Sequence, residues 1–546
     1  MRAWLPVAFG TLIAALAAAL YLPFLANELI FDDRFFFSGR HFARYATTPL
    51  GVELRLPGYF SLAFVEVVSG SIAAQRLVSL ALHVGVALAL YQLILELLRR
   101  AVPSGRAHHL AAFGAAAAFA VHPLAVYGAG YLIQRTGLLA TLCALLSLLA
   151  FARGLERRSY GHGLTAAVLF SLAVLSKETS VLAPAAALFT LPLLAGERRF
   201  ALRYSAVYLG ACAPAALLAA LLVKGKIGTT YEPDFSVVAN QMGDAMASEA
   251  ASPWLASAMT QLELFFRYLA LWLWPDTGAM SIDLRVDFAT GGGALLALFC
   301  FVAYAAAGAW LLLRGGRAAV AGLGLLYFWV LFLVEFSTVR FADPFVLYRS
   351  YLWAPGLAIA AGALLSRLPL PANVGFLLIA LPLLGVQAHD RLQSFASGLA
   401  LWQDAVDKLP ARPVPGGSRT LYQLGREYFY RGDTARAIAT ADRCIAQYPS
   451  TYDCFFARGA IHVELEEYAS ALPFVTRAAE LRPESGSARH LLGVALEALG
   501  RADEAKAHYR AAMQLGFPGA LYRLKRMDDP GSGLLPPIRS AAPPPG

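Results

Sequence analysis

The sequence opens on "MRAWLPVAFGTLIAALAAALYLPFLA" at residues 1–26, an apolar run that contains a single arginine. About 20 consecutive apolar residues are enough for a helix to cross a bilayer. A cleavable signal peptide is the alternative interpretation, because the run is rich in alanine and follows an early positive charge. Further long apolar runs follow along the chain, so we interpret this one as the first of several transmembrane helices.

The composition of the whole chain supports this interpretation. Of the 546 residues, 58% are hydrophobic and 15% are charged, which is too apolar for a water-soluble globular protein. The formal net charge is +9, but the basic residues lie mostly at the ends of apolar runs, where they anchor helices to anionic lipid headgroups. The charge therefore indicates membrane topology rather than binding to nucleic acid.

The order of apolar runs and basic loops predicts the topology. Short arginine-rich loops, such as residues 97–106 and 152–158, stay in the cytoplasm. We expect the N-terminus on that side, and the longer loops and the C-terminal region in the periplasm of a bacterial inner membrane. Residues 262–275 are short and contain Arg267, so we interpret them as a re-entrant or interfacial helix. We expect about eleven spans, near residues 5–26, 73–98, 108–121, 136–152, 162–175, 181–196, 202–223, 290–313, 318–336, 351–366 and 372–388.

An internal repeat follows the last apolar run. Glycines recur at a step of 34 residues, at Gly425, Gly459 and Gly493, and alanines recur at the same step. This is the period of tetratricopeptide repeats (TPRs), in which each pair of helices buries its apolar face against the next pair. We expect three repeats over residues 418–517, with a capping helix on each side.

The sequence therefore predicts three parts. They are a membrane domain at residues 1–390, a periplasmic TPR domain at 391–527 and a disordered tail rich in proline and glycine at 528–546. Cys444 and Cys454 lie on either side of a short turn between two repeats. A disulfide between them fits an oxidising compartment, and two small packing residues are the alternative.

Charged and polar residues gather in the loops that we place on the periplasmic side. Asp32 and Asp33 directly follow the first span. Carboxylates and basic groups at one membrane face suit a phosphate-bearing substrate, because a carboxylate can act as general base while cations hold a leaving phosphate. For each residue taken singly, a local ion pair or an interfacial anchor is the alternative. The other candidates are Arg55, His122, Arg135, Lys177, Glu178 and Arg349.

The order of these motifs resembles a known family. "FDDR" (31–34), "AVHPLAVYGAGYLIQRTGLLATL" (120–142), "LSKETSVLAP" (175–184) and "YRSYL" (348–352) precede the repeats. This order is similar to that of the transmembrane-and-TPR protein O-mannosyltransferases and their bacterial relatives, which belong to the GT-C glycosyltransferase superfamily. The resemblance covers nearly the whole chain. The chain departs from the family at three points. The family usually has an acidic residue soon after His-Pro, where Tyr127 stands here. It also commonly has Glu-His at the positions of Leu347 and Tyr348, and a proline at the position of Trp353.

The resemblance implies an all-α fold, with a GT-C-like membrane domain followed by a TPR α-solenoid. It also implies transfer of a sugar from a polyprenyl-phosphate donor to Ser or Thr of an envelope protein, with inversion at the anomeric carbon. In that reaction Asp33 or Asp32 takes the proton of the acceptor hydroxyl. Asp33 is the first choice, because the more distal residue of the pair projects further from the helix end.

The remaining roles also follow from the resemblance. Arg135, Lys177 and Arg349 are candidates to hold the lipid phosphate. Glu178 is expected to orient Lys177 or to help bind a divalent metal, and His122 to form a hydrogen bond with either substrate. The concave face of the TPR domain is expected to receive the protein acceptor.

Three other functions fit parts of the sequence. A GT-C transferase could modify a surface glycan or lipid instead of a protein. A membrane-anchored TPR scaffold would explain the repeats, but an anchor has no use for many spans with charged residues at one face. A transporter or flippase would carry its charged residues in the middle of spans, whereas here they lie at the ends of apolar runs.

Overall fold

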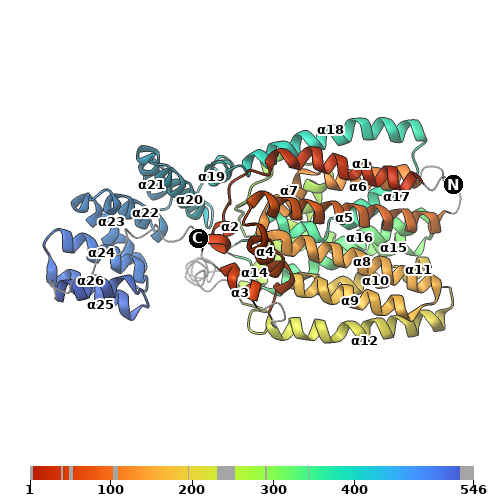
Figure 1. The fold of residues 1–546 in the computed structure, drawn as a ribbon, viewed down its shortest axis with the longest axis horizontal. Coiled ribbons are helices and arrows are strands. Elements are labelled where there is room, and N and C mark those ends of the chain that lie inside the picture. The colour runs from red at the N-terminus through yellow and green to blue at the C-terminus, as the bar shows by residue number, and fades with distance from the viewer. Residues whose placement is uncertain are drawn as a thin grey trace. The chain divides into compact units, whose positions relative to one another are not determined.

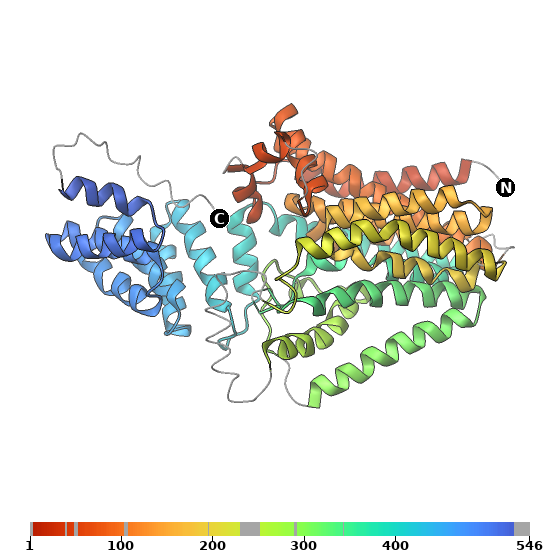
Figure 2. The same cartoon turned by 90° about the horizontal axis from the view of Figure 1, so that it is seen from below.

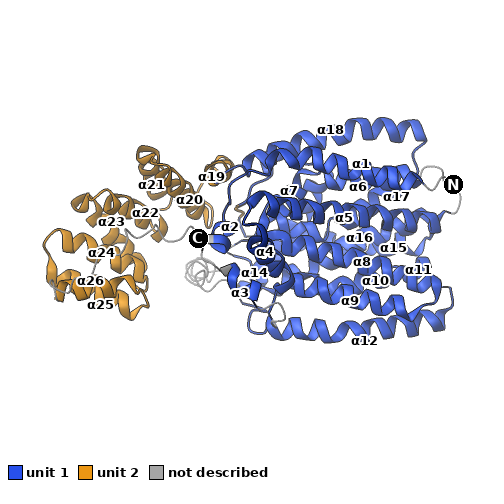
Figure 3. Ribbon diagram, in the orientation of Figure 1, with its two compact units in different colours: residues 1–282, 287–397 blue, residues 283–286, 398–546 orange. Residues whose placement is uncertain are grey.

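The structure is a computed structural model, and it describes residues 4–38, 41–47, 53–102, 108–194, 196–229, 252–288, 292–341 and 343–528. The regular elements of these residues are helices. The chain divides into two compact units, which Figure 3 shows in different colours: residues 1–282 with 287–397, and residues 283–286 with 398–546. Apart from Asp528, the tail that we predict at residues 528–546 lies outside the described residues.

The first unit is a bundle of long apolar helices with shorter helices between them (Figure 1). Its helices are α1 (Trp4–Tyr21), η1 (Leu22–Phe24), α2 (Asp32–Ser38), α3 (His41–Thr47), α4 (Leu56–Ser69), α5 (Ile72–Ala101), α6 (His108–Ala120), α7 (Pro123–Ala129), η2 (Leu132–Gln134), α8 (Arg135–Arg157), α9 (Tyr160–Ser176), η3 (Glu178–Leu182), α10 (Ala183–Leu188), α11 (Leu191–Leu194), α12 (Arg198–Leu222), α14 (Pro253–Leu273), η6 (Thr277–Ala279), α15 (Gly292–Leu313), α16 (Gly316–Phe332), η7 (Leu333–Ser337), η8 (Leu347–Leu352), α17 (Pro355–Leu365) and α18 (Leu370–Ser394).

Among the described residues, seven helices are long and apolar enough to cross a membrane, or up to eight if the bent pair α6 and α7 forms one span. We predict about eleven spans, and this test of length and composition supports seven or eight of them. Three predicted spans correspond to α9, to η3 with α10 and α11, and to α17, which have only 10–17 residues. These segments are apolar but shorter than the seven long helices. The seven are α1 with η1, α5, η2 with α8, α12, α15, α16 with η7, and α18.

The segment that we predict to be re-entrant or interfacial lies in α14. This helix has 21 residues and contains Glu263 and Arg267. It is not one of the candidate spans.

The two ends of the bundle differ. The N-terminus lies at one end, and the short helices α2, α3 and α4 lie at the other (Figure 1). Figure 2 shows the same separation from a second direction. Because α2 begins with Asp32 and Asp33, these two aspartates lie at the end away from the N-terminus.

Two glycines bring α16 and α17 into direct backbone contact. A Cβ atom built on Gly324 would lie 2.3 Å from the carbonyl oxygen of Gly356, and one built on Gly356 would lie 2.4 Å from the carbonyl oxygen of Gly324. No side chain fits at such distances, so both positions need glycine. Small residues at helix contacts are a common way for membrane helices to pack closely.

The second unit consists of paired antiparallel helices that follow the predicted repeats. α20 (Gly417–Tyr430) pairs with α21 (Thr434–Gln447), α22 (Tyr452–Glu464) with α23 (Tyr468–Leu481), and α24 (Gly486–Ala498) with α25 (Ala502–Gln514). α19 (Gly398–Asp407) and α26 (Gly519–Asp528) flank them. The prediction of a C-terminal TPR α-solenoid is confirmed.

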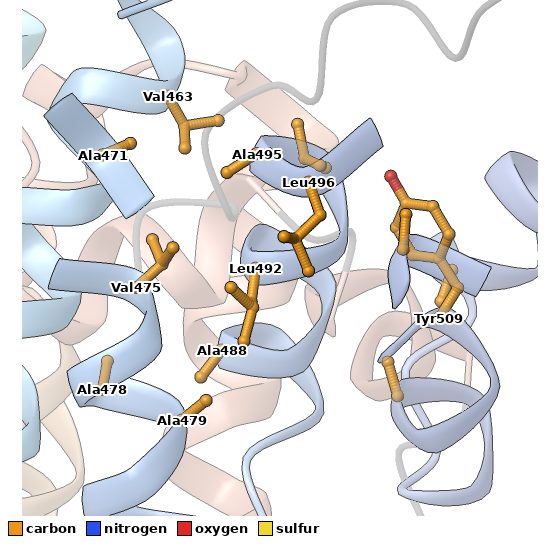
Figure 4. Packing of buried hydrophobic residues seen from close by; sticks show 14 residues of the cluster. Val463, Ala471, Val475, Ala478, Ala479, Ala488, Leu492, Ala495, Leu496 and Tyr509 are labelled. Carbon is orange, nitrogen blue, oxygen red and sulfur yellow. The ribbon is translucent and has the colours of Figure 1, made fainter. Parts of the chain in front are cut away.

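Each helix pair of the second unit buries small and branched side chains against its neighbour. Figure 4 shows Val475 of α23, Leu492 of α24 and Tyr509 of α25 in one cluster of buried residues. Cys444 and Cys454 are joined by a disulfide. The sequence allows either a disulfide or two separate packing residues here, and the structure shows the disulfide. The segment Asp283–Val286 also belongs to this unit, and the hydroxyl group of Thr420 donates a hydrogen bond to Asp283 at 2.9 Å.

Candidate active site

The two aspartates of the first loop lie at the start of α2, directly after a strained residue. Phe31 has a φ of +45°, a left-handed conformation that is costly for a side chain of its size. The backbone then turns, and the N–H of Asp33 donates to the carbonyl oxygen of Ile30 at 2.9 Å. The two carboxylates consequently point into different surroundings.

Asp33 is fully buried, with no exposed surface. Its two carboxylate oxygens accept hydrogen bonds from the backbone N–H groups of Ile133 at 2.8 Å and Leu132 at 3.3 Å, which belong to the turn η2. Burial raises the pKa of Asp33 to about 7, although the charge of Arg76 and the two backbone hydrogen bonds act in the opposite direction. The contacts of Asp33 therefore connect α2 to η2.

Asp32 is only half-buried. Its backbone N–H donates to the hydroxyl oxygen of Tyr131 at 3.2 Å, and its carboxylate is hydrogen-bonded to the same tyrosine. Tyr131 is fully buried, and burial raises its pKa well above the usual value, so its hydroxyl group stays protonated and donates to the carboxylate. Of the two aspartates, Asp32 is the one that a substrate can reach.

Lys177 lies in a largely buried position after the last turn of α9. Its Nζ donates to Oε1 of Gln134 at 2.8 Å and lies 5.2 Å from the centre of the Tyr348 ring. The Tyr348 ring is in turn 6.1 Å from that of Tyr131. Burial, together with the charge of Arg55, lowers the pKa of Lys177 to about 7. These aromatic contacts connect the lysine to the neighbourhood of Asp32.

Arg55 and Glu178 form a bidentate ion pair. Nε of Arg55 donates to Oε2 of Glu178 at 3.0 Å, and Nη2 donates to Oε1 at 2.5 Å. Burial alone would raise the pKa of Glu178, but the charge and hydrogen bonds of Arg55 lower it to about 2. Glu178 is therefore ionised at any physiological pH, and it holds Arg55 next to Lys177.

Glu335 connects the last group of basic residues. It is buried, and its Oε2 lies 3.2 Å from Nη1 of Arg349 and 3.4 Å from Nε of Arg340. The charges of Arg349 and Glu335 both act on Lys177, so this group lies within electrostatic reach of the lysine. Sequence reasoning missed Glu335, although an acidic residue inside the apolar run "LFLVEF" (331–336) is a usable signal for a functional site.

These contacts define one site at the end of the bundle that holds α2. We call it the loop-end site. Its acidic part is Asp32 and its basic part is Lys177, and Tyr131 and Tyr348 lie between them. The other members are Asp33, Arg55, Gln134, Glu178, Glu335, Arg340 and Arg349.

Two predicted site residues have other surroundings. Arg135 is fully buried and donates to Ser79, to the backbone carbonyl of Ser61 and to both the carbonyl and side-chain oxygens of Gln75. His122 precedes α7, accepts a hydrogen bond from the N–H of Leu124 at 3.2 Å and stacks on Trp272 at 4.3 Å. These contacts hold both side chains within the bundle, and the charge of Asp33 also acts on Arg135.

The described residues do not by themselves form a metal site. Across the described ranges, no three His, Cys, Asp or Glu side chains come together in a way that could hold a metal ion. At the loop-end site the oxygens of Asp33 are engaged by backbone N–H groups and those of Glu178 by Arg55. We therefore derive no step through a metal.

Comparison with protein families identifies the membrane region. Residues 56–223 match the family described as dolichyl-phosphate-mannose-protein mannosyltransferase. The chain carries a mannosyltransferase domain of the GT-C superfamily. Residues 419–451 and 486–515 each match a tetratricopeptide repeat. The prediction of a multi-pass membrane glycosyltransferase with C-terminal TPRs is thus confirmed, and Lys177 and Glu178 lie inside the matched mannosyltransferase segment.

Solved structures resemble parts of the chain at low identity. The Archaeoglobus fulgidus oligosaccharyltransferase tethered with an acceptor peptide is 15% identical over 76% of this chain and 60% of its own, with a TM-score of 0.39. The first TPR domain of Spaghetti (RPAP3) bound to an HSP90 peptide is 24% identical over 20% of this chain and 90% of its own, with a TM-score of 0.20. MamA from Desulfovibrio magneticus is 24% identical over 20% of this chain and 64% of its own, with a TM-score of 0.19. No curated protein matches the chain.

Proposed function

We propose that this mannosyltransferase transfers a sugar from a polyprenyl-phosphate donor to a Ser or Thr hydroxyl of an envelope protein, and that the reaction takes place at the loop-end site. One observation carries the proposal: a reachable carboxylate, Asp32, and a group of basic side chains around Lys177 meet at the same end of the bundle. Glycosyl transfer from a lipid phosphate needs a base for the acceptor and cations for the leaving phosphate.

The carboxylate of Asp32 acts as the general base. It takes the proton of the acceptor hydroxyl while the acceptor oxygen forms a bond to the anomeric carbon. The bond from that carbon to the phosphate oxygen breaks in the same step, so polyprenyl phosphate leaves and the configuration inverts. The half-buried position of Asp32 supports this assignment over Asp33, the residue that the sequence favours, because Asp33 has no exposed surface.

The basic group holds the phosphate of the donor. Lys177, Arg55 and Arg349 carry positive charge, and the carboxylates of Glu178 and Glu335 fix the two arginines by ion pairs of 2.5 Å and 3.2 Å. Preorganised cations stabilise the charge that develops on a leaving phosphate without having to reorganise during the step. Tyr348 lies beside Lys177, and its ring offers an apolar wall for the sugar.

The acceptor and the orientation complete the proposal. The TPR domain offers a surface for a protein acceptor, since stacked TPRs form extended concave binding surfaces. The disulfide between Cys444 and Cys454 supports a periplasmic TPR domain, because disulfides persist in oxidising compartments. The loop-end site then faces the periplasm, and the N-terminus faces the cytoplasm of a bacterial inner membrane.

Glycoproteomics on a deletion strain tests the acceptor class. The strain is complemented with the wild-type chain or with Asp32→Asn, and Ser/Thr-linked sugars on envelope proteins are compared. We expect one or more sugars to be lost in the deletion strain, restored by the wild type and not restored by the variant. An unchanged glycoproteome with an altered surface glycan or lipid would contradict the protein acceptor, and no change in any glycoconjugate would favour a scaffold.

A further inference from the structure

A second cluster of basic groups lies far from the loop-end site. α5 begins beside that site, where Gln75 accepts a hydrogen bond from Arg135, and it continues for another 24 residues to Arg99. At 1.5 Å per residue this separation is about 36 Å along the helix axis. Arg99 therefore lies at the end of the bundle that holds the N-terminus (Figure 1). α6 begins at this end with His108 and His109.

The guanidinium group of Arg99 is held by a neutral partner. Its Nη2 lies 2.8 Å from Nε2 of His109, and Nδ1 of His109 lies 2.8 Å from the hydroxyl oxygen of Tyr91. Because arginine can only donate, Nε2 of His109 accepts, and a neutral imidazole then carries its proton on Nδ1 and donates to Tyr91. The position of Arg99 is thus fixed while its positive charge stays uncompensated.

Two further polar groups of this cluster lack partners. Nε2 of His108 and Nε of Arg317 are buried and have no hydrogen-bond partner among the described residues. The His108 side chain is only 3% exposed, and the charges of Arg317 and Arg99 both act on it. A buried nitrogen without a partner is costly in a folded protein, so both nitrogens are suited to donate to a bound ligand.

The nearby carboxylates do not neutralise this cluster. Glu96 lies one turn before Arg99 on α5, but its oxygens pair with Arg153 at 2.5 Å and with Arg100 at 3.7 Å. Glu156 also pairs with Arg100. Within the described part of the chain, neither Arg99 nor Arg317 forms an ion pair.

We propose that this cluster binds the phosphate group of an anionic ligand. Arg99, Arg317 and Nε2 of His108 supply charge and donors, and His108 is the first residue of α6, a helix of 13 residues. Helix N-termini with adjacent arginines are well suited to phosphate. The same chemistry fits the headgroup of an anionic phospholipid and a phosphate-bearing solute, and the experiment separates these two sources.

Thermal unfolding of the purified full-length protein in neutral detergent tests the site, because a ligand that binds the folded state raises the melting temperature. The probes are phosphatidylglycerol in mixed micelles, inorganic phosphate, and diacylglycerol as a lipid without phosphate. The variants are Arg317→Gln and Arg317→Lys. Arg157→Gln is the matched control, because Arg157 is an exposed arginine in the last turn of α8 and its loss removes the same charge.

We expect phosphatidylglycerol to raise the melting temperature of the wild type, and Arg317→Gln to weaken its apparent affinity about tenfold, which equals the loss of about one charge-assisted contact. Arg317→Lys should retain part of the affinity, and Arg157→Gln should leave it unchanged. A similar dependence with inorganic phosphate identifies a soluble ligand, and a response to the lipid alone identifies a headgroup.

Three results would overturn the proposal. One is an equal loss of affinity in Arg157→Gln, which would mean that charge anywhere at this end suffices. Another is a response to diacylglycerol as large as that to phosphatidylglycerol. The third is the absence of any response to both phosphate-bearing probes. Arg317 has no ion pair in the described structure, so its replacement should leave the melting temperature without ligand close to that of the wild type.

Discussion

Asp32 and Asp33 are neighbours in the sequence, but their surroundings give them different tasks. Asp33 is fully buried and accepts from two backbone N–H groups of η2, whereas Asp32 is half-buried and is hydrogen-bonded to Tyr131. The sequence shows that two carboxylates follow the first span. It does not show which of them is accessible, because the residues that enclose Asp33 come about 100 positions later.

Replacing each aspartate separately by asparagine should therefore give two different phenotypes. Asp32→Asn removes the general base, so we expect sugar transfer in membranes to fall about 100- to 10,000-fold, with an unchanged melting temperature. Asp33→Asn places an amide N–H₂ group where two backbone N–H groups need an acceptor. We expect it to destabilise the fold by about 1–3 kcal/mol.

Sugar transfer and thermal unfolding of the same two purified variants provide the check. The assignment of the base is wrong if Asp32→Asn keeps full activity. It is also wrong if Asp33→Asn abolishes transfer while its melting temperature equals that of the wild type.

The pH dependence of donor use should report on Lys177. Burial, with the charge of Arg55, lowers its pKa to about 7, so the side chain is an ammonium below that pH and neutral above it. Since only the ammonium attracts the donor phosphate, we expect kcat/KM for the donor to fall as the pH rises above about 7. In Lys177→Arg the positive charge persists to high pH, so this fall should disappear. A fall of equal size at the same pH in Lys177→Arg would exclude the lysine as its source.

At the scale of the helices, the sequence predicts most elements and misjudges some lengths. The 34-residue step predicts the paired helices of the TPR domain, because repeated glycines and alanines mark the same contacts in each repeat. The bounds of the membrane helices are harder to predict, because an apolar run does not reveal where a turn interrupts it. Residues 181–196 illustrate this point, since η3, α10 and α11 together occupy what we predict as one span.

Two glycines at equivalent positions of the repeats should respond differently to alanine. A Cβ atom on Gly493 would lie 2.7 Å from the ring of Tyr509, whose hydroxyl group is held by Glu497 at 2.6 Å. We expect Gly493→Ala to cost about 1–3 kcal/mol through overpacking. A Cβ atom on Gly425 meets its nearest atom at 3.6 Å, so Gly425→Ala should be neutral or stabilise helix α20 by up to about 1 kcal/mol.

Hydrogen exchange of the backbone amides in the full-length protein measures both effects. Protection should fall in α24 and α25 for Gly493→Ala and stay unchanged or rise in α20 for Gly425→Ala. Equal effects of the two substitutions would show that the close contact with Tyr509 does not decide the outcome.

At the scale of the whole molecule, the order of motifs along the chain carries most of the functional prediction. The sequence predicts Asp32, Arg55, Lys177, Glu178 and Arg349 as site residues. In the structure, hydrogen bonds and ring contacts connect Asp32 to Lys177, and the charges of the other three act on Lys177. The sequence alone does not predict the hydrogen bonds of Arg135 or the stacking of His122 on Trp272, because these partners come from distant helices. Sequence reasoning misses Glu335 for a similar reason, because its ion pairs with Arg340 and Arg349 form only after the chain turns back.

The orientation of the chain can be tested through its cysteines. If the TPR domain lies in the periplasm, Cys444 and Cys454 should react with a membrane-impermeant maleimide on cells whose inner membrane is intact, and only after treatment with a reductant. Replacing both cysteines by serine should abolish this labelling. Labelling without the reductant would contradict the disulfide, and labelling only after the inner membrane is broken would contradict the orientation.

Turnover of the lipid-linked donor tests the central claim most directly. The wild-type protein is reconstituted in vesicles with polyprenyl-phosphate-linked mannose and an envelope protein fraction, and both the released polyprenyl phosphate and the anomeric configuration of the transferred sugar are measured. The mechanism at the loop-end site predicts release that depends on the protein and a product of inverted configuration. No release above the protein-free control, or a product that retains the donor configuration, would contradict a single-step displacement by an acceptor that Asp32 activates.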